Sequence, residues 1–278
     1  MPEWTCPNCN ASATTPYCPA CGEEKLRTGD LSLRVLVFQL VESATHIDGR
    51  LVRSFRYLLG RPGALTDTFL KGQRKPYVGP VALFLICNAL FFATELLTGG
   101  HVFTTPLEMH LHKQPWDFLA QELVEKKLAA KRVDLDAYAP LFDQAVALKA
   151  RSLIIFMALV FSLAPALIFL RHKRPLITHV VFSLHLYAFL LLLLSAALWI
   201  QATSAWFGGP GKESDTFDDV LSIGLLIASA VYLYFATGSV YGERGISRTL
   251  KTIFLTFVVA NVVLGYRFAL LLITLYST

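Results

Sequence analysis

The chain has 278 residues, of which 54% are hydrophobic and only 16% are charged, and its mean hydropathy is +0.52. This composition is too apolar for a soluble protein of this length, so it excludes that class and indicates a membrane protein. The formal net charge is +5, and the distribution of the basic residues along the chain carries more information than their sum.

Two Cys-x-x-Cys pairs open the chain: Cys6 with Cys9, and Cys18 with Cys21. This spacing directs four thiolates at one tetrahedral centre, as in structural zinc sites. A disulfide framework is the alternative, but so short a segment has no core, and no signal peptide directs it to an oxidising compartment. We therefore expect a zinc ribbon over residues 1–26, with iron as the alternative metal, since rubredoxin-like sites use the same ligands.

Residues 27–77 are expected to form cytoplasmic amphipathic juxtamembrane helices. Asp30 can cap a first helix, whose apolar residues recur every three or four positions from Leu33 to Val41. A second helix over Asp48–Leu59 mixes apolar residues with arginines, and Arg61-Pro62-Gly63 ends it. Such helices either lie on the cytoplasmic leaflet, with arginines near acidic headgroups, or pack on the ends of the membrane bundle.

Five apolar runs follow, each near the roughly 20 residues that cross a bilayer. The sequence therefore predicts an all-α membrane protein with five transmembrane helices over residues 78–278 and an external segment at 98–151. The predicted spans are Val78–Leu97, Ser152–Leu170, His179–Ile200, Val220–Thr237 and Thr252–Tyr276.

Lysine and arginine collect in segments that should face the cytoplasm. Residues 1–77 carry ten of them and Arg171–Arg174 carries three, whereas the link at 201–219 carries one lysine beside four acids. The N-terminus should therefore be cytoplasmic and the C-terminus periplasmic. The external segment has seven bases offset by seven acids, and its His110-Leu-His112 is a weak signal for a metal.

Polar residues inside the predicted spans are candidate functional groups, because burying them in lipid is costly. By depth along their helices, Glu95 should lie level with Arg267, and Asn88 level with Asn261. The sequence thus permits a Glu–Arg pair and an Asn–Asn contact, which serve either a polar pathway or the helix register. His185 is either a proton relay or a histidine satisfied by a neighbouring hydroxyl or carbonyl.

A series of short motifs links the cysteines to the first span. The motifs are Asp48-Gly49-Arg50, Arg61-Pro62-Gly63, Lys71-Gly72-Gln73-Arg74, Tyr77 and Pro80. Together with the cysteine pairs they resemble a bacterial family of zinc-ribbon membrane proteins catalogued as a domain of unknown function. The resemblance is most specific over residues 6–84, and Tyr241-Gly242-Glu243 is a further local likeness. It implies the fold and the membrane location, and no activity.

Three functions fit this sequence: a non-catalytic adaptor of the bacterial inner membrane, a small transporter or channel, and a lipid-acting membrane enzyme. No Ser-x-x-Lys, Gly-x-Ser-x-Gly, His-Glu-x-x-His or phosphate-loop signature occurs. The sequence therefore lacks the common signatures of soluble enzymes and of nucleotide-driven transporters. We therefore favour the adaptor, with structural zinc as cofactor and a protein partner bound through the ribbon. The two Cys-x-x-Cys pairs carry almost no basic side chain, so binding of nucleic acid is not expected. A homo-oligomer stays an open alternative.

Overall fold

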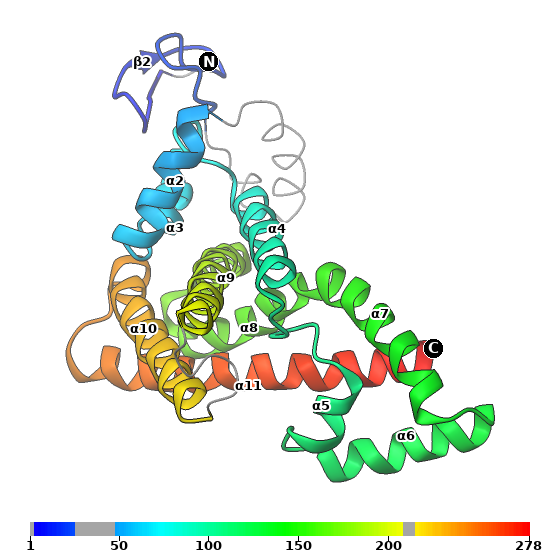
Figure 1. Cartoon of the computed structure of the whole chain (residues 1–278). Helices are drawn as coiled ribbons and strands as arrows, with labels where there is room; N and C mark the ends of the chain where they lie inside the picture. Colours follow the sequence, from blue (N-terminus) through cyan, green and yellow to red (C-terminus); the bar gives the residue numbers. More distant parts are fainter. Residues whose placement is uncertain (1–2, 26–47, 208–214) are drawn as a thin grey trace.

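Figure 1 shows the fold of the chain as a computed structural model, which describes residues 3–25, 48–207 and 215–278. One small sheet opens it, in which β1 (Trp4–Thr5) pairs antiparallel with β2 (Ser12–Ala13). The helix expected after Asp30 lies outside the described residues. The helices that follow are α2 (Asp48–Gly60), α3 (Ala64–Leu70), α4 (Pro80–Thr98), α5 (Leu107–His112), α6 (Asp117–Lys131), α7 (Leu135–Leu153), α8 (Ile155–Ile168), the 3-10 turn η1 (Leu170–His172), α9 (Leu176–Trp206), α10 (Asp215–Tyr241) and α11 (Gly245–Ser277).

Four helices are long and apolar enough to cross a membrane: α4, α9, α11, and α10 over Phe217–Tyr241. Helices α7 and α8 meet the combined requirement of length and apolar composition only together, and they meet at a bend of 47°. Over the described residues the structure therefore has four candidate spans, or five if the bent pair is one span. This set of helices indicates a multi-pass helical membrane protein.

The second expected span is where the structure departs from the prediction. Helix α8 has 14 residues, which is about 21 Å of helix and shorter than the roughly 30 Å hydrocarbon core. Helix α7 also begins at Leu135 and continues through Pro140, which is the sixth residue of the helix. The proline removes one backbone hydrogen bond in the second turn, and the helix continues past it.

Helix α9 is the centre of the bundle. Its side chains are buried without a gap from Ile177 to Ala188, as in a helix surrounded by other helices. Helix α4 packs along it, and Gly100 just after α4 lies against Leu198 near the end of α9, so these two helices run in the same direction. Helices α10 and α11 expose large apolar residues such as Ile223 and Phe257, as lipid-facing helices do.

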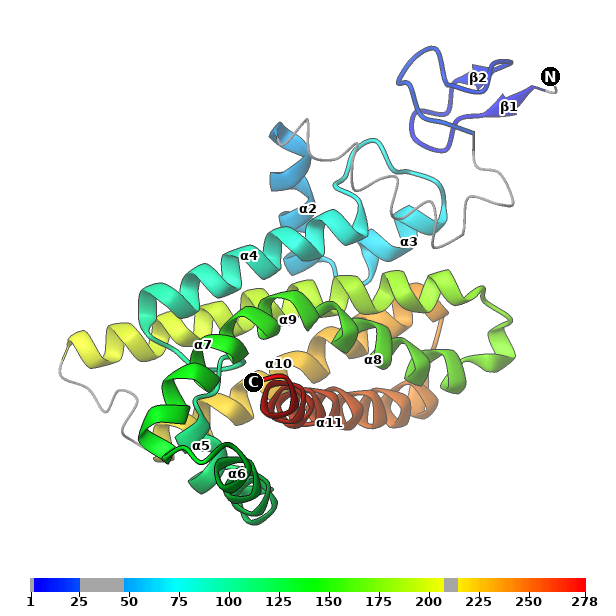
Figure 2. The same cartoon turned by 90° about the vertical axis from the view of Figure 1, so that its right-hand side faces the viewer.

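The bundle has two distinct ends (Figures 1 and 2). The ribbon and the connector, which we define as residues 48–79 with α2 and α3, lie where α4 and α9 begin; this is called the ribbon end. Helices α5 and α6 lie at the opposite, distal end. Helix α6 buries Ala120 and Val124, while Phe118 is 80% exposed. It therefore buries Ala120 and Val124 on one face, and Leu123 and Leu128 of the same helix are partly buried against the core.

Candidate functional site

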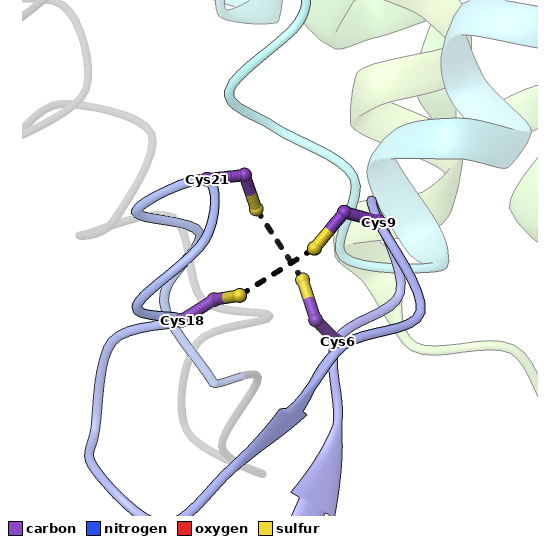
Figure 3. A group of neighbouring side chains, drawn as sticks. All are labelled: Cys6, Cys9, Cys18 and Cys21. Atoms are coloured by element: carbon purple, nitrogen blue, oxygen red, sulfur yellow. Dashed lines mark hydrogen bonds between the residues drawn. The ribbon is translucent and has the colours of Figure 1, made fainter.

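The four cysteines of the two pairs converge at the N-terminus (Figure 3). Their sulfur atoms all lie within 4.8 Å of one another. The Sγ atoms of Cys6 and Cys21 are 3.5 Å apart, as are those of Cys9 and Cys18. Over the described residues, this is the one group of three or more histidine, cysteine or acidic side chains close enough to share a metal ion.

Each of the two cysteine pairs lies on its own backbone turn, and the two turns have the same hydrogen-bond pattern. The N–H of Cys6 donates to the carbonyl of Ala11, and the N–H of Cys18 donates to that of Glu23. Asn10 and Gly22 follow the second cysteine of each pair and take positive φ angles of 58° and 71°. Glycine, and more rarely asparagine, adopts this left-handed conformation at low cost, which is why these residue types stand there.

The cysteine cluster fits a metal bound by four thiolates. A tetrahedral centre with Zn–S bonds near 2.3 Å places its sulfur atoms about 3.8 Å apart, within the spacing found here. The N–H of Glu23 lowers the pKa of the Cys21 thiol to about 7, whereas the neighbouring thiols Cys18 and Cys21 raise that of Cys9. A bound cation would favour the thiolate at all four positions. These residues could therefore hold a metal ion that fastens the two turns of the ribbon together.

The ribbon docks on the loop that carries the Lys71-Gly72-Gln73-Arg74 motif. The Glu23 carboxylate, only 2% exposed, accepts the N–H groups of Arg74 at 3.2 Å and Lys75 at 3.0 Å. The Gln73 amide donates to the carbonyl of Pro7, inside the first cysteine turn, at 2.5 Å. The loop is kept compact by Gly72, whose φ is 83°. The motif thus forms the seat of the ribbon.

Further residues of the predicted motifs hold α2 against the start of α4. Arg50 donates to the carbonyl of Tyr77 at 2.7 Å, and the buried Ser54 hydroxyl accepts the N–H of Val78 at 2.9 Å. The guanidinium of Arg61 lies 5.3 Å from the centre of the Tyr57 ring, which packs on Tyr77. Asp48 is the first residue of α2, Pro62 lies in the turn after it, and Pro80 is the first residue of α4.

Helix α3 is the part of the connector that contacts the membrane bundle. Gly63, with φ of 81°, precedes it, and a Cβ there would lie 2.9 Å from the Cα of Ala236 in α10. The Thr66 hydroxyl hydrogen-bonds Nδ1 of His185 in α9 at 2.8 Å, and both side chains are buried. The sequence left a relay and a satisfied histidine open for His185, and the contact found is a hydroxyl partner.

Glu95 and Arg267 meet at the distal end through a shared backbone segment. The Glu95 carboxylate, 4% exposed, accepts the N–H groups of Val102 at 2.7 Å and Phe103 at 3.0 Å. The Arg267 guanidinium donates through Nε to the carbonyl of Val102 at 2.9 Å. The two charges hold opposite sides of Val102, and they do not form the direct ion pair that the sequence permits.

The contact between Asn88 and Asn261 that the sequence permits is not formed. The amide nitrogen of Asn88 donates to the carbonyl of Arg151 at 3.3 Å, and its buried oxygen has no hydrogen-bond partner. Asn261 is exposed and donates to Phe257 of its own helix at 2.8 Å. Equal depth along two helices does not fix the direction in which each side chain points, so matching depths predicted a contact that the packing does not make.

Two polar clusters were not predicted from the sequence. At the distal end His110, 1% exposed, accepts a hydrogen bond from the indole N–H of Trp116 at 3.3 Å. Burial, with the nearby charge of Arg267, lowers the pKa of His110 to about 4. At the ribbon end the buried Glu243 binds Lys251. The Tyr241-Gly242-Glu243 likeness pointed to this second cluster, but it gave no role to the carboxylate.

A protein-family model matches residues 48–92 of the chain, and the family is described as a protein of unknown function (DUF3667). The match covers the connector and the first part of α4, and it agrees with the expected resemblance to an uncharacterised family. The four ribbon cysteines lie before the matched segment. Neither the curated proteins nor the solved structures give a significant match.

Proposed function

We propose that this chain is a non-catalytic adaptor of the bacterial inner membrane. A zinc ion held by the four cysteines folds the ribbon on the cytoplasmic side, the connector holds the ribbon at the membrane, and the helices anchor the assembly. The ribbon presents a binding surface to a protein partner. Zinc is the metal of choice because a closed, tetrahedral set of four thiolates is typical of structural zinc.

The docking of the ribbon is the observation that carries the proposal. Glu23 and Gln73 join the ribbon to the loop at 71–75 through hydrogen bonds to backbone groups on both sides. This loop leads directly to α4 and follows α3, which is itself bound to α9 through His185. A ribbon fixed in this way has a defined orientation relative to the membrane, which an adaptor needs and a loosely tethered metal store does not.

The polar residues of the bundle give less support to transport or catalysis. His185 contacts Thr66 at the ribbon end, whereas Glu95 and Arg267 bind backbone groups of the distal loop. Asn261 bonds within its own helix. A route across the bilayer needs polar groups that face one continuous path. These side chains instead satisfy one another or the backbone at separate places.

The cytoplasmic placement of the ribbon follows from the basic residues at the ribbon end. Of the ten lysines and arginines of residues 1–77, the eight that lie in the described ranges 3–25 and 48–77 belong to the same end of the bundle as those at 171–174. With five crossings the C-terminus is periplasmic. Reporter fusions at Thr278 and at Arg174 should then read as external and internal respectively, and a cytoplasmic Thr278 would mean four crossings.

The adaptor is tested by site-specific photo-crosslinking in cells that produce the full chain. A crosslinking residue at Tyr17, which is 57% exposed on the ribbon, should give one discrete adduct. The same residue at Leu141, 60% exposed at the distal end, is the matched control and should not give that adduct. The Tyr17 adduct should vanish when Cys9 and Cys18 are changed to Ser, because the ribbon then loses its metal.

Two results would overturn the adaptor. The first is a Tyr17 adduct that persists in the cysteine variant, since the partner would then not recognise the folded ribbon. The second is ion or solute flux through the purified protein in liposomes that is lost on Glu95→Gln, since this would assign the bundle to transport.

A further inference from the structure

A cluster of cations lies at the ribbon end, away from the zinc ribbon and the connector. It combines the link before α9 with the link between α10 and α11. We call it the ribbon-end basic patch and define it by four exposed side chains, namely Arg171, Lys173, Arg174 and Arg244.

Aromatic packing brings the two links together. The ring of Phe169 stacks on Tyr241 with centroids 3.8 Å apart and planes 10° from parallel. Nε2 of His172 lies 3.7 Å from a carboxylate oxygen of Glu243, so η1 and the start of α11 are also joined through polar groups. The cations of the patch therefore come from one surface, although some 70 residues separate the links in the sequence.

The negative charge near the patch is already committed. Glu243 is the one acidic residue in the two links taken together, which are residues 169–175 and 241–251. Its carboxylate binds Lys251 and accepts the Ser247 hydroxyl at 2.9 Å. Burial would raise its pKa, but the hydrogen bonds from Lys251 and Ser247 and the nearby charges hold it below its usual value. Over the described residues, the four cations of the patch form no salt bridge.

Exposed apolar side chains place the patch at the edge of the hydrocarbon core. Leu170 and Leu176 are 67% and 52% exposed, and Ile246 and Leu250 are 79% and 62% exposed. Each stands within six residues of a patch cation. Leu176, Ile246 and Leu250 lie near the starts of α9 and α11, which are long enough to span a membrane. Cations beside lipid-facing leucine and isoleucine lie at the level of the phospholipid headgroups.

We propose that the ribbon-end basic patch binds the phosphate groups of anionic phospholipids in the adjoining leaflet. Charge complementarity favours an anion, and the apolar rim favours one that carries acyl chains. Nucleic acid fits less well, because single strands bind by stacking bases on exposed rings, and Phe169 and Tyr241 are 0% and 3% exposed. The lipid would hold the end of α10 and the start of α11 beside η1 at the ribbon end.

The experiment uses the purified full chain in a nonionic detergent. Native mass spectrometry measures the apparent affinity for phosphatidylglycerol and for phosphatidylcholine of the same acyl chains. The wild type should bind phosphatidylglycerol at least thirtyfold more tightly than phosphatidylcholine at low salt. Arg171→Gln combined with Arg244→Gln should weaken this binding about thirtyfold at low salt, because each interfacial cation contributes about fivefold. Binding of phosphatidylcholine should not change.

The matched control combines Lys113→Gln with Lys127→Gln, two cations at the distal end that form no salt bridge there. It removes the same net charge and should keep the wild-type preference. If it lowers the affinity as much as the patch variant, general electrostatics explains the binding and the patch is refuted. Inorganic phosphate or a short oligonucleotide, added at equal charge, should not displace phosphatidylglycerol from the wild type. Displacement by either would refute the proposal that the patch binds lipid. If the patch variant misfolds, the wild type alone tests the same contact. Its preference for phosphatidylglycerol should be lost between low and high salt, and a preference that does not depend on salt contradicts the proposal.

Discussion

Glu95→Gln should destabilise the fold through the backbone of the loop after α4. One carboxylate oxygen of Glu95 accepts two backbone N–H groups, from Val102 and Phe103, at 2.7 and 3.0 Å. An amide retains one carbonyl acceptor without the charge, and in the other orientation it turns an N–H₂ group towards these donors. The distal loop therefore loses the charge-assisted part of both hydrogen bonds.

The size of the loss follows from these contacts. Hydrogen bonds to a charged group contribute about 1.5–3 kcal/mol each, against about 1 kcal/mol for a neutral one. Replacing two charged bonds by neutral ones should lower the free energy of unfolding by about 1–4 kcal/mol. Arg267→Gln removes one charged donor to the carbonyl of Val102, so its loss should be about 1–3 kcal/mol.

The two substitutions should not be additive, because both side chains hold Val102. Once one has gone, the loop moves more freely and the other has less to stabilise. The double variant should therefore lose less than the sum of the single losses, by about 0.5–3 kcal/mol. Unfolding is followed in mixed micelles by denaturant titration, with Leu96→Ala, a change at a 75% exposed apolar position, as the control. Losses that add within about 0.5 kcal/mol would show that the two charges are independent.

Three further predictions concern other regions. Burial lowers the pKa of His110 to about 4, whereas an unfolded histidine titrates near 6.5, so the free energy of unfolding should fall as pH drops below 6.5. From pH 7 to 5 the wild type should lose about 2 kcal/mol more than His110→Asn. Equal pH profiles of the two proteins would contradict this. Elemental analysis should find one zinc per chain, and zinc retained after all four ribbon cysteines are changed to Ser would exclude the site. Gly63→Ala should cost about 2–4 kcal/mol in thermal unfolding, since its Cβ meets Ala236 at positive φ; Gly60→Ala, where nothing lies within 4 Å, is the control, and a neutral Gly63→Ala would refute the contact.

The cysteine cluster could be predicted because its chemistry is local. Two cysteines three positions apart on one turn form half a tetrahedral site whatever the rest of the chain does, and a second such turn completes it. The membrane helices are also local features, since each is an uninterrupted apolar run. The exception is the second span, where the apolar run continues but the helix bends between α7 and α8. A bend depends on the packing of both halves, and hydropathy does not report it.

The side-chain partners could be predicted only in part, because they depend on rotation about each helix axis. Equal depth correctly brought Glu95 and Arg267 to one level, but the loop at 102–104 lies between them. The same argument failed for Asn261, which faces outwards. His110 was missed as a buried group because Trp116 and Phe142 enclose it only in the folded distal end. No periodicity in a short polar segment indicates such burial.

The connector explains how the ribbon and the bundle can act as one unit. The matched family segment includes Arg74 and Lys75, which hold Glu23 of the ribbon, and Thr66, which holds His185 of α9. It also includes Gly63, whose missing side chain allows close approach to α10. A force on the ribbon therefore reaches α9 and α10 through one short, hydrogen-bonded path. The ribbon needs the connector for its orientation, and the connector needs both α9 and α10 for its own position.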